Sequence, residues 1–378
     1  MPAVRRGAQL FRRHLSNQRV HQAAVYSLPF AGLNNPVLTH LLDSLSLSDP
    51  GTYLVVFLAV SLLMMWRLEA MLDHGLEGTA LGTLVMPYCS GLGNLIFVGI
   101  MLAHRGAAKE VMTNCLVNNV TNLTLLLGLP ALFWGLAVIP PAAKSGARGA
   151  KKAPKPSKSA RNRGTENQLS RLSLLLTLTA VVFFTAAVWA LGRDGKLDRT
   201  DGLILIGLFL FWQCFQVFDV LKHNVRHRVG FKLMFYVDLL VVVACSYLMY
   251  ETIDWMVAWL SAQKSGFVSA AHLGWLTGWL MVMPNAILAL YWGWKRRADV
   301  VYTSQVGDGH ICIPLCLGLY ALVKPLPVTA FFQTGMLILF GAVVVHGVLL
   351  VLTGGLPRWA GALLTAAYAW FVWQGLLT

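Results

Sequence analysis

Residues 125–129 have the sequence Leu-Leu-Leu-Gly-Leu, and the chain repeats this pattern at 315–319 as Leu-Cys-Leu-Gly-Leu. Upstream of each copy stands a second pair of related segments, Met-Pro through Asn at 86–94 and Met-Pro-Asn at 283–285. Gly128 and Gly318 are 190 residues apart, and Asn94 and Asn285 are 191 residues apart. Because self-similarity at a constant spacing is typical of a duplicated structural unit, these segments predict an internal repeat.

The composition of the chain is that of a membrane protein. Of its 378 residues, 57% are hydrophobic and only 12% are charged, which is too apolar for an ordinary soluble domain. A helix of about 20 apolar residues crosses a bilayer, and ten stretches satisfy this length. These stretches are 52–74, 79–103, 110–139, 170–191, 201–219, 233–250, 271–293, 299–323, 328–350 and 358–377.

Ten spans divide into two sets of five, in line with the repeat. Since five is an odd number, the second set enters the membrane from the opposite side. The sequence therefore predicts an all-α membrane protein with about ten transmembrane helices in two inverted five-helix repeats. The expected parts are a basic N-terminal extension (1–50), helices 1–3 of the first repeat (51–139), a linker (140–170), helices 4–5 (171–220) and the second repeat with helices 6–10 (221–378).

The net charge of +14 comes from clusters of basic residues beside the spans. If the first span enters from outside, the predicted cytoplasmic connections hold sixteen Lys and Arg residues and the outer connections hold seven. This bias agrees with the positive-inside rule, so nucleic acid is not an expected partner. The largest cluster falls within 140–170, which is rich in Ala, Lys, Pro, Ser and Gly and is expected to be a disordered cytoplasmic linker.

The first 42 residues hold five arginines and no acidic residue, which is unusual for an exported tail. They lack the apolar core of a secretory signal, and three interpretations stay open: a transit peptide, an interfacial amphipathic helix, or an extension from a misassigned start. The expected location is the plasma or inner membrane, and this segment leaves an organelle membrane open. The lipid bilayer and inorganic cations are the predicted partners, and the sequence does not indicate an oligomeric state.

The stretch 113–122, Thr-Asn-Cys-Leu-Val-Asn-Asn-Val-Thr-Asn, precedes the first leucine-rich run, and Ser-Gly-Leu-Gly-Asn stands at 90–94. Together they resemble the first repeat of the cation/calcium exchanger superfamily, in which Gly-Thr-Ser-Leu-Pro-Glu is followed by Gly-Asn-x-x-Gly-Ser-Asn-x-x-Asn. The segment 195–202, Gly-Lys-Leu-Asp-Arg-Thr-Asp-Gly, is similar to a further family signature, Gly-x-Ile-Ser-Arg-x-Glu-Gly. The resemblance spans roughly residues 52–377 and implies a secondary-active cation antiporter rather than an enzyme.

The chain departs from this family at positions that carry charge. The glutamate that ends each family Pro-Glu segment is Asn94 in the first half and Asn285 in the second. In the second half, Asp308 stands at a family serine and Cys312 at a polar ligand position. The resemblance implies a cation site at the bilayer midplane, built from Ser90, Asn94, Asn118, Asn122, Asn285, Asp308 and Cys312.

This ligand set predicts which cations the site prefers. Neutral amide oxygens with a single carboxylate suit a monovalent cation or a proton better than a tightly held Ca2+. No resident cofactor is predicted, and the transported cation is expected to be Ca2+, Na+, K+ or H+. A different interpretation is a degenerate, non-transporting scaffold or sensor with the exchanger fold, because Val117, Met281 and Val282 replace small and hydroxyl residues of the family.

Several other polar residues in the spans are expected to be structural. Asp238 lies near the basic connection 222–232 and is expected to pair there, and His310 is expected to be a satisfied core histidine. The cysteines, including Cys115 and Cys316, have no metal-motif spacing and are expected to act as small apolar residues. Asp308 is the functional candidate, because a carboxylate within a membrane helix is costly.

Overall fold

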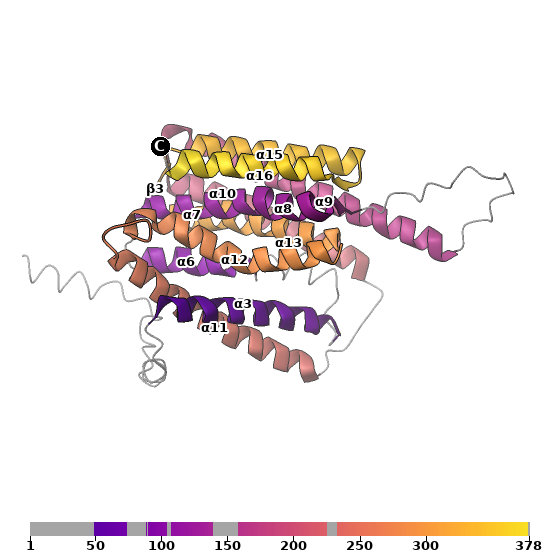
Figure 1. Ribbon diagram of the computed structural model, residues 1–378, viewed down its shortest axis with the longest axis horizontal. Helices are drawn as coiled ribbons and strands as arrows, with labels where there is room; N and C mark the ends of the chain where they lie inside the picture. The colour runs from indigo at the N-terminus through magenta and orange to yellow at the C-terminus, as the bar shows by residue number, and fades with distance from the viewer. Residues whose placement is uncertain are drawn as a thin grey trace, which may run out of the picture. The chain divides into compact units, whose positions relative to one another are not determined.

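The computed structural model describes residues 49–73, 88, 90–103, 107–138, 158–224 and 233–376, which are almost entirely helical (Figure 1). Tyr53–Thr378 forms one compact unit. The predicted basic extension, 1–50, lies outside the described residues apart from its last two, and so does the part of the predicted linker that precedes Lys158.

In the described part of the chain, each predicted span contains one helix when α7 with α8, and α13 with α14, are counted as single interrupted helices, so the all-α membrane fold is confirmed. Eight described segments are long and apolar enough to cross a membrane, and α6 is a shorter apolar helix. The first half contains α3 (Pro50–Asp73), α6 (Leu92–Ala103), α7 (Ala108–Val120), α8 (Leu126–Trp134), α9 (Lys158–Leu191) and α10 (Arg199–Asn224). The second half contains α11 (Leu233–Ala262), α12 (Leu273–Trp294), α13 (Ala298–His310), α14 (Leu317–Val323), α15 (Phe332–Leu352) and α16 (Arg358–Leu376).

Two helices extend beyond the spans that apolar composition predicts. α9 begins at Lys158, inside the predicted linker, so residues 158–170 are helical rather than disordered. α11 continues to Ala262, well past the predicted end at 250. An apolar window detects only the part of a helix that suits lipid, whereas backbone hydrogen bonding continues through polar residues that favour helix.

Two central helices are interrupted by a wider π turn at equivalent places in the repeat. The first turn, η2, covers Thr121–Leu125 between α7 and α8, and the second, η5, covers Ile311–Cys316 between α13 and α14. In η5, Pro314 supplies no backbone N–H, which breaks the regular helix ladder. In η2, the hydroxyl groups of Thr121 and Thr124 donate to carbonyls one turn earlier, which bends the ladder. Such turns are frequent at functional sites.

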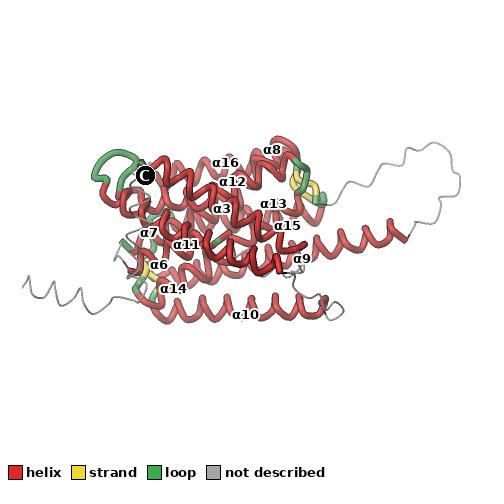
Figure 2. The backbone as a smooth tube through the Cα atoms, turned by 90° about the horizontal axis from the view of Figure 1, so that it is seen from below, coloured by secondary structure: helices red, strands yellow, loops and turns green. Residues whose placement is uncertain are grey.

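Two short antiparallel ladders join the halves of the chain. β1 (Leu136–Ala137) pairs with β4 (Gly355–Leu356), and β2 (Lys196–Leu197) pairs with β3 (Leu326–Pro327). Figure 2 shows these ladders, in yellow, at opposite ends of the helices. β1 and β3 are 190 residues apart, which is the spacing of the repeat, so they are equivalent strands. Their two ladders lie at opposite ends of the helix bundle. This is the arrangement expected of an inverted repeat.

Close helix crossings account for the glycines that mark the repeat. Gly361 of α16 lies against α8, where an added Cβ would stand 2.6 Å from the carbonyl oxygen of Gly128. Gly202 of α10 lies in the same way against α14, with the carbonyl oxygen of Gly318 at 2.8 Å. Small residues allow helices in lipid to approach closely. The leucine-rich runs around Gly128 and Gly318 are therefore the surfaces on which α16 and α10 pack.

Candidate cation-binding site

Asp308 is a fully buried carboxylate near the end of α13, just before η5. Its Oδ2 atom accepts a hydrogen bond of 2.6 Å from Nδ2 of Asn122 in η2, and one of 3.3 Å from Nδ2 of Asn285 in α12. The side chain of Ser90, just before α6, also hydrogen-bonds this carboxyl group. Segments from both repeats therefore converge on one acidic residue.

Polar contacts continue from Asp308 across the interface between the repeats. Nδ2 of Asn122 is also 2.9 Å from Oδ1 of Asn118, and the thiol of Cys312 donates to that same oxygen over 3.3 Å. Asn118 and Asn122 are about one helical turn apart, and so are Asp308 and Cys312. The structure thus brings together Asp308, Ser90, Asn118, Asn122, Asn285 and Cys312, which we call the Asp308 cluster.

The remaining predicted ligand, Asn94, is fully buried on α6, and neither atom of its amide has a hydrogen-bond partner in the described part of the chain. Oδ1 of Asn122 is a second buried amide oxygen in the same situation. A buried polar atom left unpaired costs about 1–3 kcal/mol. Hard cations prefer amide and carboxylate oxygens as ligands. The oxygen atoms of these side chains therefore fit a bound cation.

Glycines keep the backbone close to the Asp308 cluster. A Cβ at Gly91 would lie 3.1 Å from Oδ1 of Asp308 and 2.7 Å from the Cβ of Ile311, so a side chain there would displace the acid. Gly309 faces Asn119, whose Oδ1 would be 3.2 Å from an added Cβ. Positions 119 and 309 are equivalent in the repeat and meet each other, so two amides would collide. The second repeat therefore has glycine where the first has asparagine.

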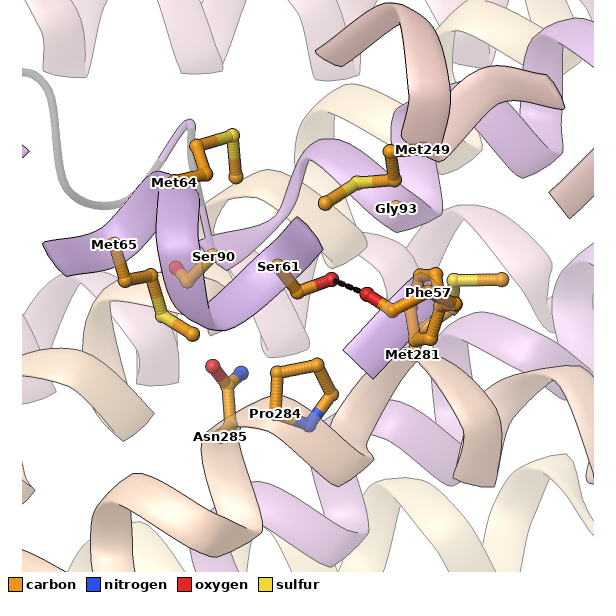
Figure 3. Close-up of a pocket in the computed structure, with 10 residues that line it drawn as sticks. All are labelled: Phe57, Ser61, Met64, Met65, Ser90, Gly93, Met249, Met281, Pro284 and Asn285. Carbon is orange, nitrogen blue, oxygen red and sulfur yellow. Dashed lines mark hydrogen bonds between the residues drawn. The ribbon is translucent and has the colours of Figure 1, made fainter. Parts of the chain in front are cut away.

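A small cavity opens beside the cluster, between α3, the start of α6, α11 and α12 (Figure 3). It has room for about one water molecule. Ser90 and Asn285 line it and also contact Asp308, so the cavity leads toward the acid. Its other lining residues are Phe57, Ser61, Met64, Met65, Gly93, Met249, Met281 and Pro284.

Sequence reasoning missed the contribution of α3. Ser61, Met64 and Met65 belong to no motif, and the first span shows only apolar composition, so nothing in the sequence connects them with the cavity. Asp238 is a second case. The sequence points to the connection 222–232 as its partner, but the structure places Nη1 of Arg67 in α3 3.5 Å from the fully buried carboxylate. Residues 225–232 lie outside the described residues.

His310 contacts α9 rather than the Asp308 carboxylate. Its Nε2 lies 3.2 Å from the carbonyl oxygen of Thr177, and its ring packs against Phe184 and Trp212. This is the satisfied core histidine that the sequence predicts. Asn114, one of the asparagines that resemble the family motif, donates to the hydroxyl of Thr277 over 3.1 Å and holds α7 against α12.

Comparison with known proteins is consistent with this fold. The family described as sodium/calcium exchanger protein matches residues 50–218 of the chain. A structure of the sodium-calcium exchanger NCX_Mj soaked with 10 mM Na+ and zero Ca2+ has a TM-score of 0.59 and 17% identity, covering 86% of this chain and 98% of that one. Another, soaked with 2.5 mM Na+ and 0.1 mM Ca2+, has a TM-score of 0.57 and 17% identity, covering 86% and 96%. No curated protein matches the chain.

The family match and the shared architecture define the class of this protein. It is an integral membrane protein whose residues 50–218 match the sodium/calcium exchanger family and whose fold is similar to that of the sodium-calcium exchanger NCX_Mj. The sequence match covers residues 50–218, which include the first repeat. The structural match extends over both repeats.

Proposed function

We propose that the chain is a secondary-active cation antiporter that works by alternating access around the Asp308 cluster. The observation that carries this proposal is a single buried carboxylate held by amide groups from both repeats, between two interrupted helices. Interrupted membrane helices that meet at a repeat interface are the usual place for ion sites in secondary transporters. The activity is transport rather than enzymatic catalysis.

The charge of the cluster favours a monovalent cation. Asp308 supplies one negative charge, which balances one positive charge in a fully buried site. Asn94 and Asn285 contribute amide oxygens but no charge, and the affinity of Ca2+ falls as carboxylates are removed. We therefore propose Na+, K+ or H+ as the preferred ions, with Ca2+ as a weaker substrate, exchanged across the plasma membrane or an inner membrane.

A second candidate function is a non-transporting scaffold or sensor that keeps the exchanger fold. The small size of the cavity favours it, because about one water molecule fills the space beside Asp308. Met281 also fills space there, since its Sδ atom would lie 2.7 Å from a Cβ at Gly93. In this case the polar cluster would serve only to hold the two repeats together.

Flux measurements in proteoliposomes separate these two functions. The purified full chain is reconstituted, and gradients of Ca2+, Na+, K+ and H+ are imposed one pair at a time. Uptake of one cation driven by the opposite gradient of another is the result expected of an antiporter, and the effective pair identifies the ions. Absence of flux with every pair, from protein that retains its helical circular dichroism and unfolding transition, would contradict transport and support the scaffold.

A further inference from the structure

A histidine outside the Asp308 cluster is hydrogen-bonded to both segments that carry the central contact of the cluster. His346 of α15 is fully buried, and its Nε2 atom lies 2.8 Å from the carbonyl oxygen of Leu123 in η2. Its Nδ1 atom lies 3.2 Å from the hydroxyl of Tyr302 in α13. Leu123 directly follows Asn122, and Tyr302 and Asp308 lie on the same helix. One imidazole ring therefore joins the segment of Asn122 to the segment of Asp308.

The partners of His346 determine the direction of both hydrogen bonds. A backbone carbonyl can only accept, so the ring carries its proton on Nε2. In a neutral ring Nδ1 is then an acceptor, and the hydroxyl of Tyr302 donates to it. The carbonyl groups of a π turn are displaced from the regular helix ladder, so a donor from another helix can hold one of them in place.

The residue on the other side of Asn122 is also held by a distant side chain. The hydroxyl of Thr121 lies 3.4 Å from the hydroxyl of Tyr368 in α16, which accepts a hydrogen bond of 2.7 Å from Nε1 of Trp279 in α12. α15 and α16 lie together at the top of Figure 1, and both contact η2. Polar side chains of these two helices thus hold the chain on both sides of Asn122, although neither helix supplies a residue to the cluster.

Packing alone does not require an imidazole at this position. A leucine or phenylalanine would fill the same space without placing a polar ring inside a membrane helix, where polar groups are costly. We propose that His346 is a positioning residue of the cation site, which sets the separation of η2 from α13 and so keeps the Asn122 amide against the Asp308 carboxylate. The inference adds a residue to the machinery of the proposed exchanger and rests on that function.

Cation flux through the full chain in proteoliposomes is the first test. His346→Leu removes both hydrogen bonds, and we expect it to raise the half-saturating concentration of the transported cation, Na+ or K+, about tenfold, with a smaller effect on the maximal rate. His346→Gln is expected to recover most of this loss, because its amide offers both a donor and an acceptor. Leu350→Ala is the matched control, a fully buried change on the same helix that lowers stability and is expected to leave the half-saturating concentration unchanged.

Infrared spectroscopy of the same variants gives a readout that does not depend on transport. The carboxyl stretching band of Asp308 is the band that Asp308→Asn removes. We expect His346→Leu to shift this band and His346→Gln to restore it. Tyr302→Phe deletes only the hydroxyl that donates to His346, and it is expected to shift the band in the same direction, so it tests the proposal even if His346→Leu does not fold.

Two results would overturn the proposal. One is an unchanged Asp308 band or an unchanged half-saturating concentration in folded His346→Leu. The other is an equal rise of the half-saturating concentration in Leu350→Ala, because His346 would then act only through stability. Failure of the exchanger function is distinguishable, since it shows as absent flux of every cation in the unaltered chain while the band still shifts in His346→Leu. Normal flux with an unchanged band leaves the exchanger and contradicts the positioning role.

Discussion

At the scale of single residues, the amides of the cluster have a property that a carboxylate lacks. An amide offers a donor as well as an acceptor, so Asn122 and Asn285 can both donate to Oδ2 of Asp308. A carboxylate at either position would repel Asp308 unless a cation or proton lay between them. These two amides therefore hold one negative charge in place without a bound divalent ion.

Restoring the charges is expected to restore affinity for divalent cations. In the double variant Asn94→Glu and Asn285→Glu, three carboxylates replace one, and Ca2+ affinity is expected to rise by about tenfold or more. Equilibrium binding of radioactive Ca2+ to the purified protein measures this change. The variant Asn285→Gln, which adds length but no charge, is the control. If the folded double variant bound Ca2+ no better than this control, Asn94 and Asn285 would not belong to the cation site.

Removing the central amide is expected to destabilise the protein. Asn122→Ala deletes the donor to both Asp308 and Asn118, and the buried acceptors that remain should lower the free energy of unfolding by about 1–3 kcal/mol. Chemical unfolding in detergent measures this loss. Thr179→Ala is the control, because the Thr179 hydroxyl donates only to the Leu175 carbonyl on the same helix. Equal stability of the two variants would be inconsistent with the hydrogen bonds described.

At the scale of helices, α3 and α11 contact each other through side chains near both ends of α3, and Figure 1 shows the two helices side by side. The rings of Tyr53 and Trp255 stack with centroids 3.8 Å apart, and Nη1 of Arg67 lies 3.5 Å from the carboxylate of Asp238. The face that this pair turns toward the cluster is rich in methionine. Methionine side chains are flexible and make weakly directional contacts. We therefore expect the contacts between this face and the cluster to rearrange more easily than the ring stack and the ion pair that join α3 to α11.

The two residues of the ion pair between these helices are expected to differ in how much stability is lost when each is replaced. Arg67→Met removes a partner of a fully buried carboxylate and is expected to cost about 3–5 kcal/mol, whereas Asp238→Asn leaves a partly exposed cation and should cost less. The double variant is expected to recover part of the loss. Thermal unfolding of the three variants in detergent measures these effects. Strictly additive losses would mean that the two residues do not interact.

Helix crossings predict a symmetric effect of two distant glycines. Gly202→Ala and Gly361→Ala each force a methyl group against the backbone of the neighbouring helix, and each is expected to cost about 1–3 kcal/mol. Gly207→Ala is the control on α10, because an added Cβ there has nothing within 4 Å. The same unfolding assay applies. A neutral effect at Gly202 together with a large one at Gly361 would contradict the equivalence of the two crossings.

At the scale of the whole molecule, the repeat, the spans and the convergence of Asn118, Asn122, Asp308 and Cys312 follow from the sequence. They do so because repeated spacing and helical periodicity are local properties of the chain. The cavity wall from α3 and the pairing of Arg67 with Asp238 do not follow, because they depend on how helices without motifs pack in space. The start of α9 was also hidden, since a polar helical extension resembles a linker in composition.

The inverted repeat also explains where the two halves are allowed to differ. The ladder, the π turn and the glycine crossing each occur twice in the described residues, so the framework is symmetric. Asn118 and Asp308 are equivalent positions, as are Asn122 and Cys312, yet each pair combines different chemistry. The symmetric framework positions the segments, and the asymmetric side chains set the charge and the ligand type of the site.

The most direct test of this account is cation flux in proteoliposomes that contain Asp308→Asn. The matched control is Asp299→Asn, which neutralises a partly exposed acid in the first turn of the same helix, where it pairs with Arg297. We predict that Asp299→Asn transports like the unaltered chain, and that Asp308→Asn, although folded, loses coupled flux because the only charge in the cluster is gone. Normal coupled flux by Asp308→Asn would contradict the central role of this carboxylate.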